Sequence, residues 1–167
     1  MDSAEQELNS LMEGFEHGRI PLLEFMRSAH RIIESSDIHH DERLGKAVVG
    51  CFSRHTEGRD LMACLLEIQG FEVIPADSWS DLKDIIELCE DPEVRVLCLS
   101  VQTTYDCPEL FDLGEMLRDA GVRERLVVNG GGAALTESLA KKMDSDVYYP
   151  TAVASAKAVK ERVLERV

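Results

Sequence analysis

The chain has 167 residues, of which 18 are basic and 32 acidic, so its formal net charge is -14. This acidity argues against binding to a nucleic-acid backbone or an anionic membrane surface, because both attractions depend on Lys and Arg. No apolar run approaches the ~20 residues that span a bilayer. Residues 1–5 show no basic or apolar signal region, so we expect a cytoplasmic location.

The first 43 residues predict a helical hairpin. Leu8, Leu11, Met12 and Phe15 recur at the three-and-four spacing of a helix, and a second apolar stripe follows over residues 22–33. Pro21 suits the first turn of that second helix. Since isolated helices of this length are marginally stable in water, the apolar face needs a covering surface. We therefore expect residues 1–43 to serve as a partial cap or as a homodimerisation element.

From residue 44 onward, short apolar runs alternate with helical stripes. Such alternation predicts an α/β domain over residues 44–167, with a doubly wound parallel sheet covered on both faces. Five strands favour the flavodoxin-like order 2-1-3-4-5. Ser80 is expected to cap the second helix of this domain. The expected strands are 47–52, 71–75, 94–100, 126–129 and 147–149, and the expected helices are 59–69, 82–88, 110–117, 135–143 and 153–167.

The five cysteines predict no metal or redox site. No two of them form a C-x-x-C pair, and their spacings are irregular. We expect them to be reduced thiols used as small apolar side chains.

Candidate site residues follow the strands. In a doubly wound sheet, ligands bind beyond the carboxyl ends of the strands, near the point where the strand order reverses. His55 is a candidate metal ligand, because a neutral imidazole on a loop can coordinate a metal ion. The three consecutive glycines would admit a flat ligand or another backbone segment. The candidate residues are Ser53, Arg54, His55, Thr56, Glu57, Gly58, Ser100, Gln102, Thr103, Thr104, Gly130, Gly131, Gly132, Ala133, Tyr149, Pro150 and Thr151.

Several other doubly wound families do not fit these loops. A phosphoacceptor receiver domain needs acidic residues where Ser53 and Ser100 stand. The glycine run follows the fourth strand, so it is not a dinucleotide-binding fingerprint. Neither a P-loop nor a G-x-S-x-G nucleophile elbow occurs.

The loops together resemble those of the cobalamin (corrinoid)-binding domain family, as found in methionine synthase, corrinoid methyl-carrier proteins and carbon-skeleton mutases. That family carries Asp-x-His-x-x-Gly after strand one, Ser-x-Leu after strand three and Gly-Gly after strand four. This chain has S-R-H-T-E-G at 53–58, S-V-Q at 100–102 and G-G-G at 130–132. The end of the expected fifth strand, at 147–151, is similar to the tyrosine-x-proline end of the mutases. The resemblance covers about 120 residues, from about Lys46 to the C-terminus.

The resemblance implies a cofactor and roles for particular residues. Cobalamin would bind base-off, with its dimethylbenzimidazole tail in a slot between the sheet and the flanking helices. His55 would be the lower axial ligand of cobalt, and Ser100 would donate a hydrogen bond to the ring nitrogen of the tail. The glycines at 130–132 would make room for the tail, and Thr103, Thr104 and Thr151 would line the slot.

Two positions depart from the family pattern. Ser53 stands where the family has the Asp that accepts a hydrogen bond from the ligand histidine. Loss of such a supporting partner typically costs ~10–100-fold in metal affinity or activity. Glu57 is a candidate to compensate. Gln102 replaces the apolar residue of the Ser-x-Leu segment.

Three functions are compatible with these residues. The first is a corrinoid methyl carrier that serves a methyltransferase or another partner protein. The second is a cobalamin-dependent sensor that signals through the hairpin, and the third is the small subunit of an adenosylcobalamin mutase. A domain that has lost the cofactor is a further alternative. The loops show no evident catalytic acid or base, which favours a cofactor-carrying subunit over a complete enzyme.

Overall fold

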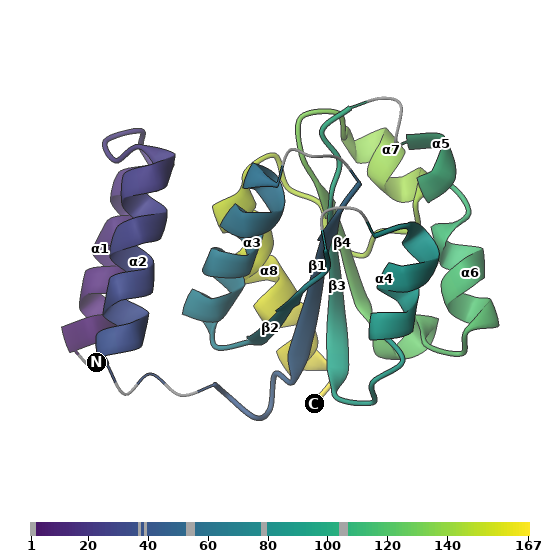
Figure 1. The fold of residues 1–167 in the computed structure, drawn as a ribbon, viewed down its shortest axis with the longest axis horizontal. Helices are drawn as coiled ribbons and strands as arrows, with labels where there is room; N and C mark the ends of the chain where they lie inside the picture. The colour runs from purple at the N-terminus through teal and green to yellow at the C-terminus, as the bar shows by residue number, and fades with distance from the viewer. Residues whose placement is uncertain (1–2, 37, 39, 53–55, 78–79, 104–106) are drawn as a thin grey trace.

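A computed structural model describes residues 3–36, 38, 40–52, 56–77, 80–103 and 107–167. Two helices, α1 (Ser3–Glu16) and α2 (Leu22–Ser35), form the predicted N-terminal hairpin (Figure 1). The elements that follow are β1 (Lys46–Cys51), α3 (Glu57–Gln69), β2 (Glu72–Pro75), α4 (Leu82–Leu88), β3 (Val94–Ser100), α5 (Cys107–Leu110), α6 (Leu113–Asp119), the short 3₁₀ helix η1 (Arg123–Arg125), β4 (Val127–Gly131), α7 (Glu137–Lys142) and α8 (Ala152–Glu165).

The described strands form a parallel sheet in the order β2-β1-β3-β4, with β1 and β3 at its centre. Cys51 at the end of β1 pairs with Ser100 of β3, and Ser100 pairs in turn with Gly131 of β4. Three strands therefore end together at one edge, as predicted for a doubly wound sheet.

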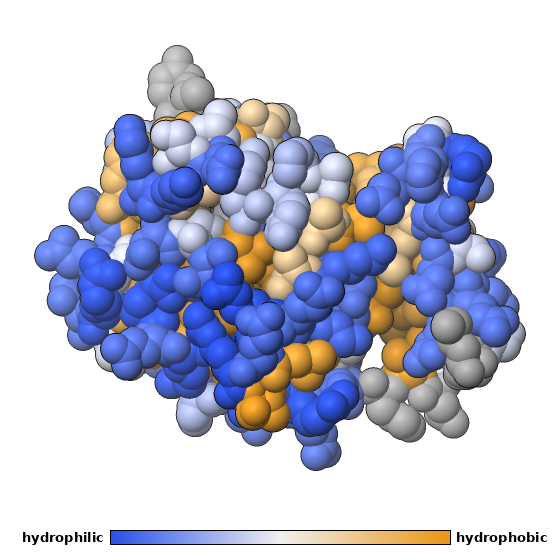
Figure 2. All heavy atoms as spheres, turned by 180° about the vertical axis from the view of Figure 1, so that it is seen from behind, coloured by the Kyte–Doolittle hydropathy of each residue, from blue (hydrophilic) through white to orange (hydrophobic). Residues whose placement is uncertain are grey.

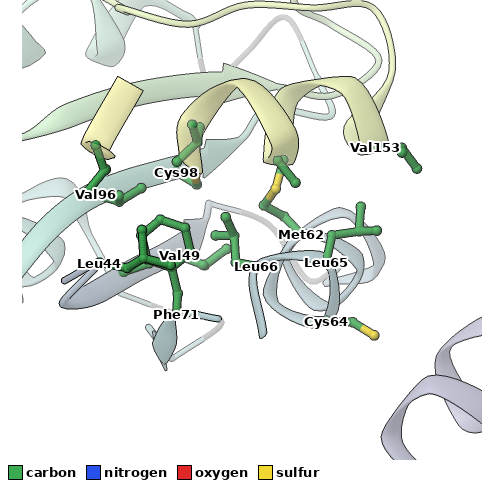
Figure 3. Close-up of a cluster of buried hydrophobic side chains, with 14 of the residues drawn as sticks. Leu44, Val49, Met62, Cys64, Leu65, Leu66, Phe71, Val96, Cys98 and Val153 are labelled. Carbon is green, nitrogen blue, oxygen red and sulfur yellow. The ribbon is translucent and has the colours of Figure 1, made fainter. Parts of the chain in front are cut away.

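Alternation along the strands divides the core into two layers. Val96 and Cys98 of β3 pack with residues of α3 and α8, whereas Leu97 and Leu99 pack with residues of α4 and α6. Successive side chains of a strand point to opposite faces, so an uninterrupted apolar run serves both layers. Figure 3 shows part of the first layer, with Met62 of α3 close to the sheet.

The hairpin packs on the first of these layers. The rings of Phe15 and Phe25 stack with their centroids 4.7 Å apart, joining α1 to α2. Buried hairpin residues, including Leu8 and Ala29, belong to the same apolar cluster as Cys64 of α3. Seen from behind, hydrophobic residues gather along the seam between the hairpin and the rest of the molecule (Figure 2). The division into domains at residue 43 stays a prediction.

Helix boundaries follow local capping chemistry. Gly70 ends α3 with φ +107°, in the left-handed region that glycine tolerates. The cap of α4 is Asp81, whose carboxylate accepts from the backbone N–H of Asp84 at 2.8 Å, so the prediction of Ser80 was wrong. The single helix expected over 110–117 is divided into α5 and α6, with the half-exposed Phe111 between them.

The predicted fifth strand is reduced to a single parallel bridge between Asn129 and Val147 among the described residues, so the predicted count of five strands was wrong. Side chains occupy the hydrogen bonds that a longer ladder would use. Asn129 Nδ2 donates to the Val147 carbonyl at 2.9 Å, and Ser145 Oγ donates to the same oxygen at 2.7 Å. Pro150 has no N–H with which to extend the ladder.

Four cysteines match the prediction of buried, reduced thiols: Cys51, Cys64, Cys89 and Cys98 are buried and form no disulfide. Burial raises the pKa of the Cys64 and Cys89 thiols to about 12, so both are protonated at neutral pH. Over the described ranges, no helix is both long and apolar enough to cross a membrane.

The segment that replaces the fifth strand yields a stability prediction. Asp146 accepts hydrogen bonds from Arg123 Nη2 at 3.0 Å and from the Val128 N–H at 2.9 Å. The Arg123 and Asp146 side chains are only 13% and 17% exposed. Asp146→Ala should therefore lower the free energy of unfolding by about 2 kcal/mol, because it leaves a buried N–H and a guanidinium short of a partner.

Urea denaturation measures this change. Asp119→Ala, at an exposed position of α6, is the matched control and should change stability by no more than about 0.5 kcal/mol. Equal effects of the two substitutions would contradict the role given to Asp146.

Candidate functional site

A cavity of about 320 Å³ lies at the carboxyl edge of the sheet, between the strand ends and the helices α3 and α8. Ligand pockets usually measure about 300–1,000 Å³, so it can hold a small ring system or part of a larger ligand. The lining residues are Val49, Gly58, Leu61, Met62, Cys98, Leu99, Ser100, Gln102, Asn129, Gly131, Gly132, Ala133, Tyr149, Pro150, Thr151, Ala152 and Ser155.

The structure brings together many of the residues predicted from the sequence. They come from the start of α3, the end of β3, the end of β4 and the segment before α8. The predicted residues that line the cavity are Gly58, Ser100, Gln102, Gly131, Gly132, Ala133, Tyr149, Pro150 and Thr151.

Other predicted residues do not line this cavity. Glu57 is exposed at the start of α3, and Thr56 Oγ1 donates to Asp60 Oδ2 at 3.1 Å. Thr103 is half-buried and also lies outside the lining. Ser53, Arg54, His55 and Thr104 lie outside the described residues.

Gly130 was predicted in a loop but lies within β4, as does Gly131. A Cβ at Gly130 would lie 2.7 Å from side-chain atoms of Leu135 and Met143, which belong to the core layer on the other face of the sheet. Because successive residues of a strand face opposite sides of the sheet, Gly131 faces the cavity and Gly130 faces the core.

Three glycines shape the cavity wall. A Cβ at Gly131 would meet no other atom within 4 Å, so this position is open. Gly132 has φ +113°, and a Cβ there would collide with the Val101 carbonyl oxygen. A Cβ at Gly58 would collide with Ser100 Oγ. Gly58 and Gly132 thus permit close backbone approach, and Gly131 leaves the space beside β4 empty.

Sequence reasoning missed half of the wall, including a buried amide and a buried hydroxyl. Asn129 stands among apolar residues in β4 and is two positions from Gly131, on the same face. Ser155 lies in the first turn of α8, among small residues, and its Oγ donates to the Tyr149 carbonyl at 3.4 Å. The position of Asn129, a polar residue inside an otherwise apolar strand, was the signal that could have identified it as a site residue. The missed residues are Val49, Leu61, Met62, Cys98, Leu99, Asn129, Ala152 and Ser155.

The described lining of the cavity carries no charged side chain. Its lining includes no carboxylate, ammonium, guanidinium or imidazole group among the described residues. Burial raises the pKa of the Cys98 thiol, which therefore contributes a protonated, weakly polar surface. Figure 3 shows Cys98, Val49 and Met62 within the same apolar layer. The cavity is suited to an uncharged, largely apolar group.

Polar side chains of the lining form hydrogen bonds within the protein. Ser100 is almost completely buried, and its Oγ accepts a hydrogen bond from Gln102 Nε2 at 2.8 Å. Thr151 caps α8, its Oγ1 accepting from the Ala154 N–H at 3.3 Å. No group of three His, Cys, Asp or Glu side chains able to hold a metal ion occurs in the described part of the chain.

Comparison with known proteins adds to this geometry. No family model matches the chain. Trimethylamine corrinoid protein 2 of Methanosarcina mazei is 30% identical over 122 residues, which is 70% of this chain and 56% of that protein. Dimethylamine corrinoid protein 2 of Methanosarcina acetivorans is 27% identical over 94% of this chain and 77% of that protein. The chain spans little more than half the length of the trimethylamine relatives.

Solved structures share the fold. The methanol:cobalamin methyltransferase complex MtaBC from Methanosarcina barkeri matches with a TM-score of 0.80 over 98% of this chain and 66% of that one, at 17% identity. A cobalamin-binding protein from Desulfitobacterium hafniense matches with a TM-score of 0.73 over 95% of this chain and 78% of that one, at 18% identity. With the loop motifs and the cavity at the carboxyl edge, these comparisons show that the chain is similar to proteins of the cobalamin-binding domain family.

Proposed function

We propose that this chain binds cobalamin base-off and acts as a corrinoid methyl-carrier subunit for a methyltransferase. The observation that carries the proposal is the neutral cavity at the carboxyl edge, open at Gly131 and bordered by Ser100. The names of the curated relatives, which are corrinoid proteins, support the same ligand.

The residues present fit the tail of the cofactor. A dimethylbenzimidazole ring is flat, uncharged and mostly apolar, as is required of a group enclosed by Leu61, Met62 and Cys98. Its ring nitrogen needs a hydrogen-bond donor, and the Ser100 hydroxyl would provide one. The absence of a side chain at Gly131 leaves room beside β4 for the ring.

His55 is the proposed lower axial ligand. It lies in the segment between Cys51, where β1 ends, and Glu57, where α3 begins. Gly58 follows it by three residues, matching the spacing of the family motif. Ser53 or Glu57 would accept a hydrogen bond from the other ring nitrogen of His55, as carboxylates and hydroxyls do for ligand histidines. When bound, the cobalt of the cofactor supplies the methyl-transfer chemistry.

The carrier function is favoured over the sensor and the mutase subunit. The curated relatives are named for trimethylamine and dimethylamine, and a structural neighbour is a methanol:cobalamin methyltransferase complex. The described lining also offers no carboxylate or imidazole for acid–base chemistry on a substrate. A carrier needs none, because its partner supplies the substrate site. The partner proposed here is therefore a methyltransferase.

The predicted homodimer through residues 1–43 stays a prediction. Leu23 of α2 is 74% exposed, and Leu11, Ile20 and Ile32 line an open groove on the hairpin. These apolar side chains would be covered if two hairpins packed together.

Mixing the purified chain with hydroxocobalamin tests the proposed function. We expect a red complex with shifted visible absorption bands, because an imidazole at cobalt differs from water or the cofactor's own base. His55→Ala should abolish the shift. His40→Ala is the matched control and should retain it, since His40 is exposed and precedes Asp41, which bonds to Gly70 at the far end of α3. The proposal fails if no complex forms, and the axial role fails if His55→Ala leaves the bands unchanged.

Filling the open position of the cavity tests where the tail binds. Gly131→Leu should weaken hydroxocobalamin binding by about 10–100-fold, the penalty of about 1–3 kcal/mol expected for overpacking a filled space. Gly131→Ala, which adds a single methyl group, should cost less. Isothermal titration calorimetry measures the affinities, and thermal unfolding checks that both variants fold. Unchanged affinity in a folded Gly131→Leu variant would place the tail elsewhere.

A further inference from the structure

One hydrogen bond in the cavity wall joins two polar side chains that the sheet and its following loop bring together. Gln102 Nε2 donates to Ser100 Oγ at 2.8 Å, and both residues line the cavity. Gly58 of α3 lies directly opposite: a Cβ at this position would collide with Ser100 Oγ and lie 2.5 Å from Gln102 Nε2. The absence of a side chain at Gly58 therefore leaves the space that the side chains of Ser100 and Gln102 occupy.

The direction of this bond determines what the hydroxyl can offer. A serine hydroxyl has one hydrogen and two lone pairs, and here one lone pair is used by Gln102. In the described part of the chain, no group accepts a hydrogen bond from Ser100 Oγ. No described residue takes this hydrogen, so the hydroxyl can donate it to a ligand atom. Because Ser100 is only 8% exposed, bulk water has little access to compete for it.

We propose that Gln102 is a positioning residue, which holds the Ser100 hydroxyl as a donor and makes the cavity selective for a corrinoid tail that carries a hydrogen-bond acceptor. The inference rests on the proposed binding of cobalamin and adds the chemical class of tail that the site prefers. A benzimidazole offers a ring nitrogen as acceptor. A phenolic tail lacks that nitrogen, and cobinamide has no nucleotide tail at all.

The amide of Gln102 does what an apolar side chain at this position cannot. Leucine at 102 would leave the Ser100 hydroxyl free to rotate, so ordering it would cost part of the binding energy. Glutamate would reverse the bond, since an ionised carboxylate only accepts and would take the Ser100 hydrogen for itself.

The affinities of two Gln102 variants for three ligands test the proposal. The ligands are hydroxocobalamin, cobinamide and a cobamide with a phenolic tail. Gln102→Leu should weaken cobalamin binding by about fivefold, the worth of roughly one hydrogen bond, and leave cobinamide binding unchanged. Gln102→Glu should weaken cobalamin binding by about tenfold or more. Binding of the phenolic cobamide should change by less than about twofold in both.

A double-mutant cycle separates positioning from general support of the fold. Ser100→Ala should weaken cobalamin binding, and adding Gln102→Leu to it should cause no further loss. Full additivity of the two losses would overturn the proposal, as would retention of wild-type affinity by Gln102→Glu. If the Ser100→Ala variant does not fold, the affinity of the Gln102→Glu variant still tests the proposal.

The outcomes also distinguish this inference from the function on which it rests. Absence of cobalamin binding by the unaltered chain would overturn both. Tight binding by the unaltered chain, with the same ratio of cobalamin to cobinamide affinity in every Gln102 variant, would overturn the role of Gln102 alone.

Discussion

Close approach of backbone segments at the carboxyl edge is the constraint on which the site depends. Gly132 lies against Val101, where the Val101 N–H donates to Gly131 at 2.7 Å and the Val101 carbonyl accepts from Ala134 at 3.1 Å. Gly58 likewise allows the start of α3 to lie against Ser100. Any larger residue at these two positions would force the walls apart. The spacing of the cavity walls therefore depends on these two glycines, which have no side chain.

The described lining of the site is separate from the charged surface. Acidic residues outnumber basic ones ten to four in residues 1–43, yet the described cavity lining contains no charged group. The charge of -14 thus belongs to the exterior, where it contributes to solubility and can complement a basic partner surface. A cavity without charge in its described lining and an acidic exterior suit a protein that holds a cofactor in one place and meets other proteins in another.

Sequence patterns predicted the sheet well where a strand is buried on both faces. β1 and β3 are mostly apolar, with Ala47, Val48 and Val49 in one and residues 96–99 in the other, and their bounds were correct or nearly so. The fifth strand failed because its hydrogen bonds go to side chains such as Asn129 and Ser145, and such pairings depend on tertiary contacts. The division of α5 from α6 was missed because the stripe of apolar residues continues through both.

Prediction of the site succeeded for loops and failed for helix faces. Residues at or just after strand ends, such as Ser100 and Gly132, were found because parallel strands end at one edge, which is a property of topology alone. Leu61 and Met62 of α3 line the cavity through side-chain direction, and a helical stripe does not tell a core contact from a cavity wall. Gly130 shows a related limit, because β4 extends through Gly131 and strand alternation turns position 130 toward the opposite core layer.

The central claim is that the cavity between the sheet, α3 and α8 receives the ligand. Amide NMR spectra of the chain with and without hydroxocobalamin test it most directly, because the cobalt(III) cofactor is diamagnetic and each backbone N–H reports its own surroundings. The account predicts shifts at Gly58, Ser100, Gly131 and Ser155, with little change at Leu117 and Ala140 in the opposite core layer. Shifts confined to that opposite layer or to the groove of the hairpin would contradict it.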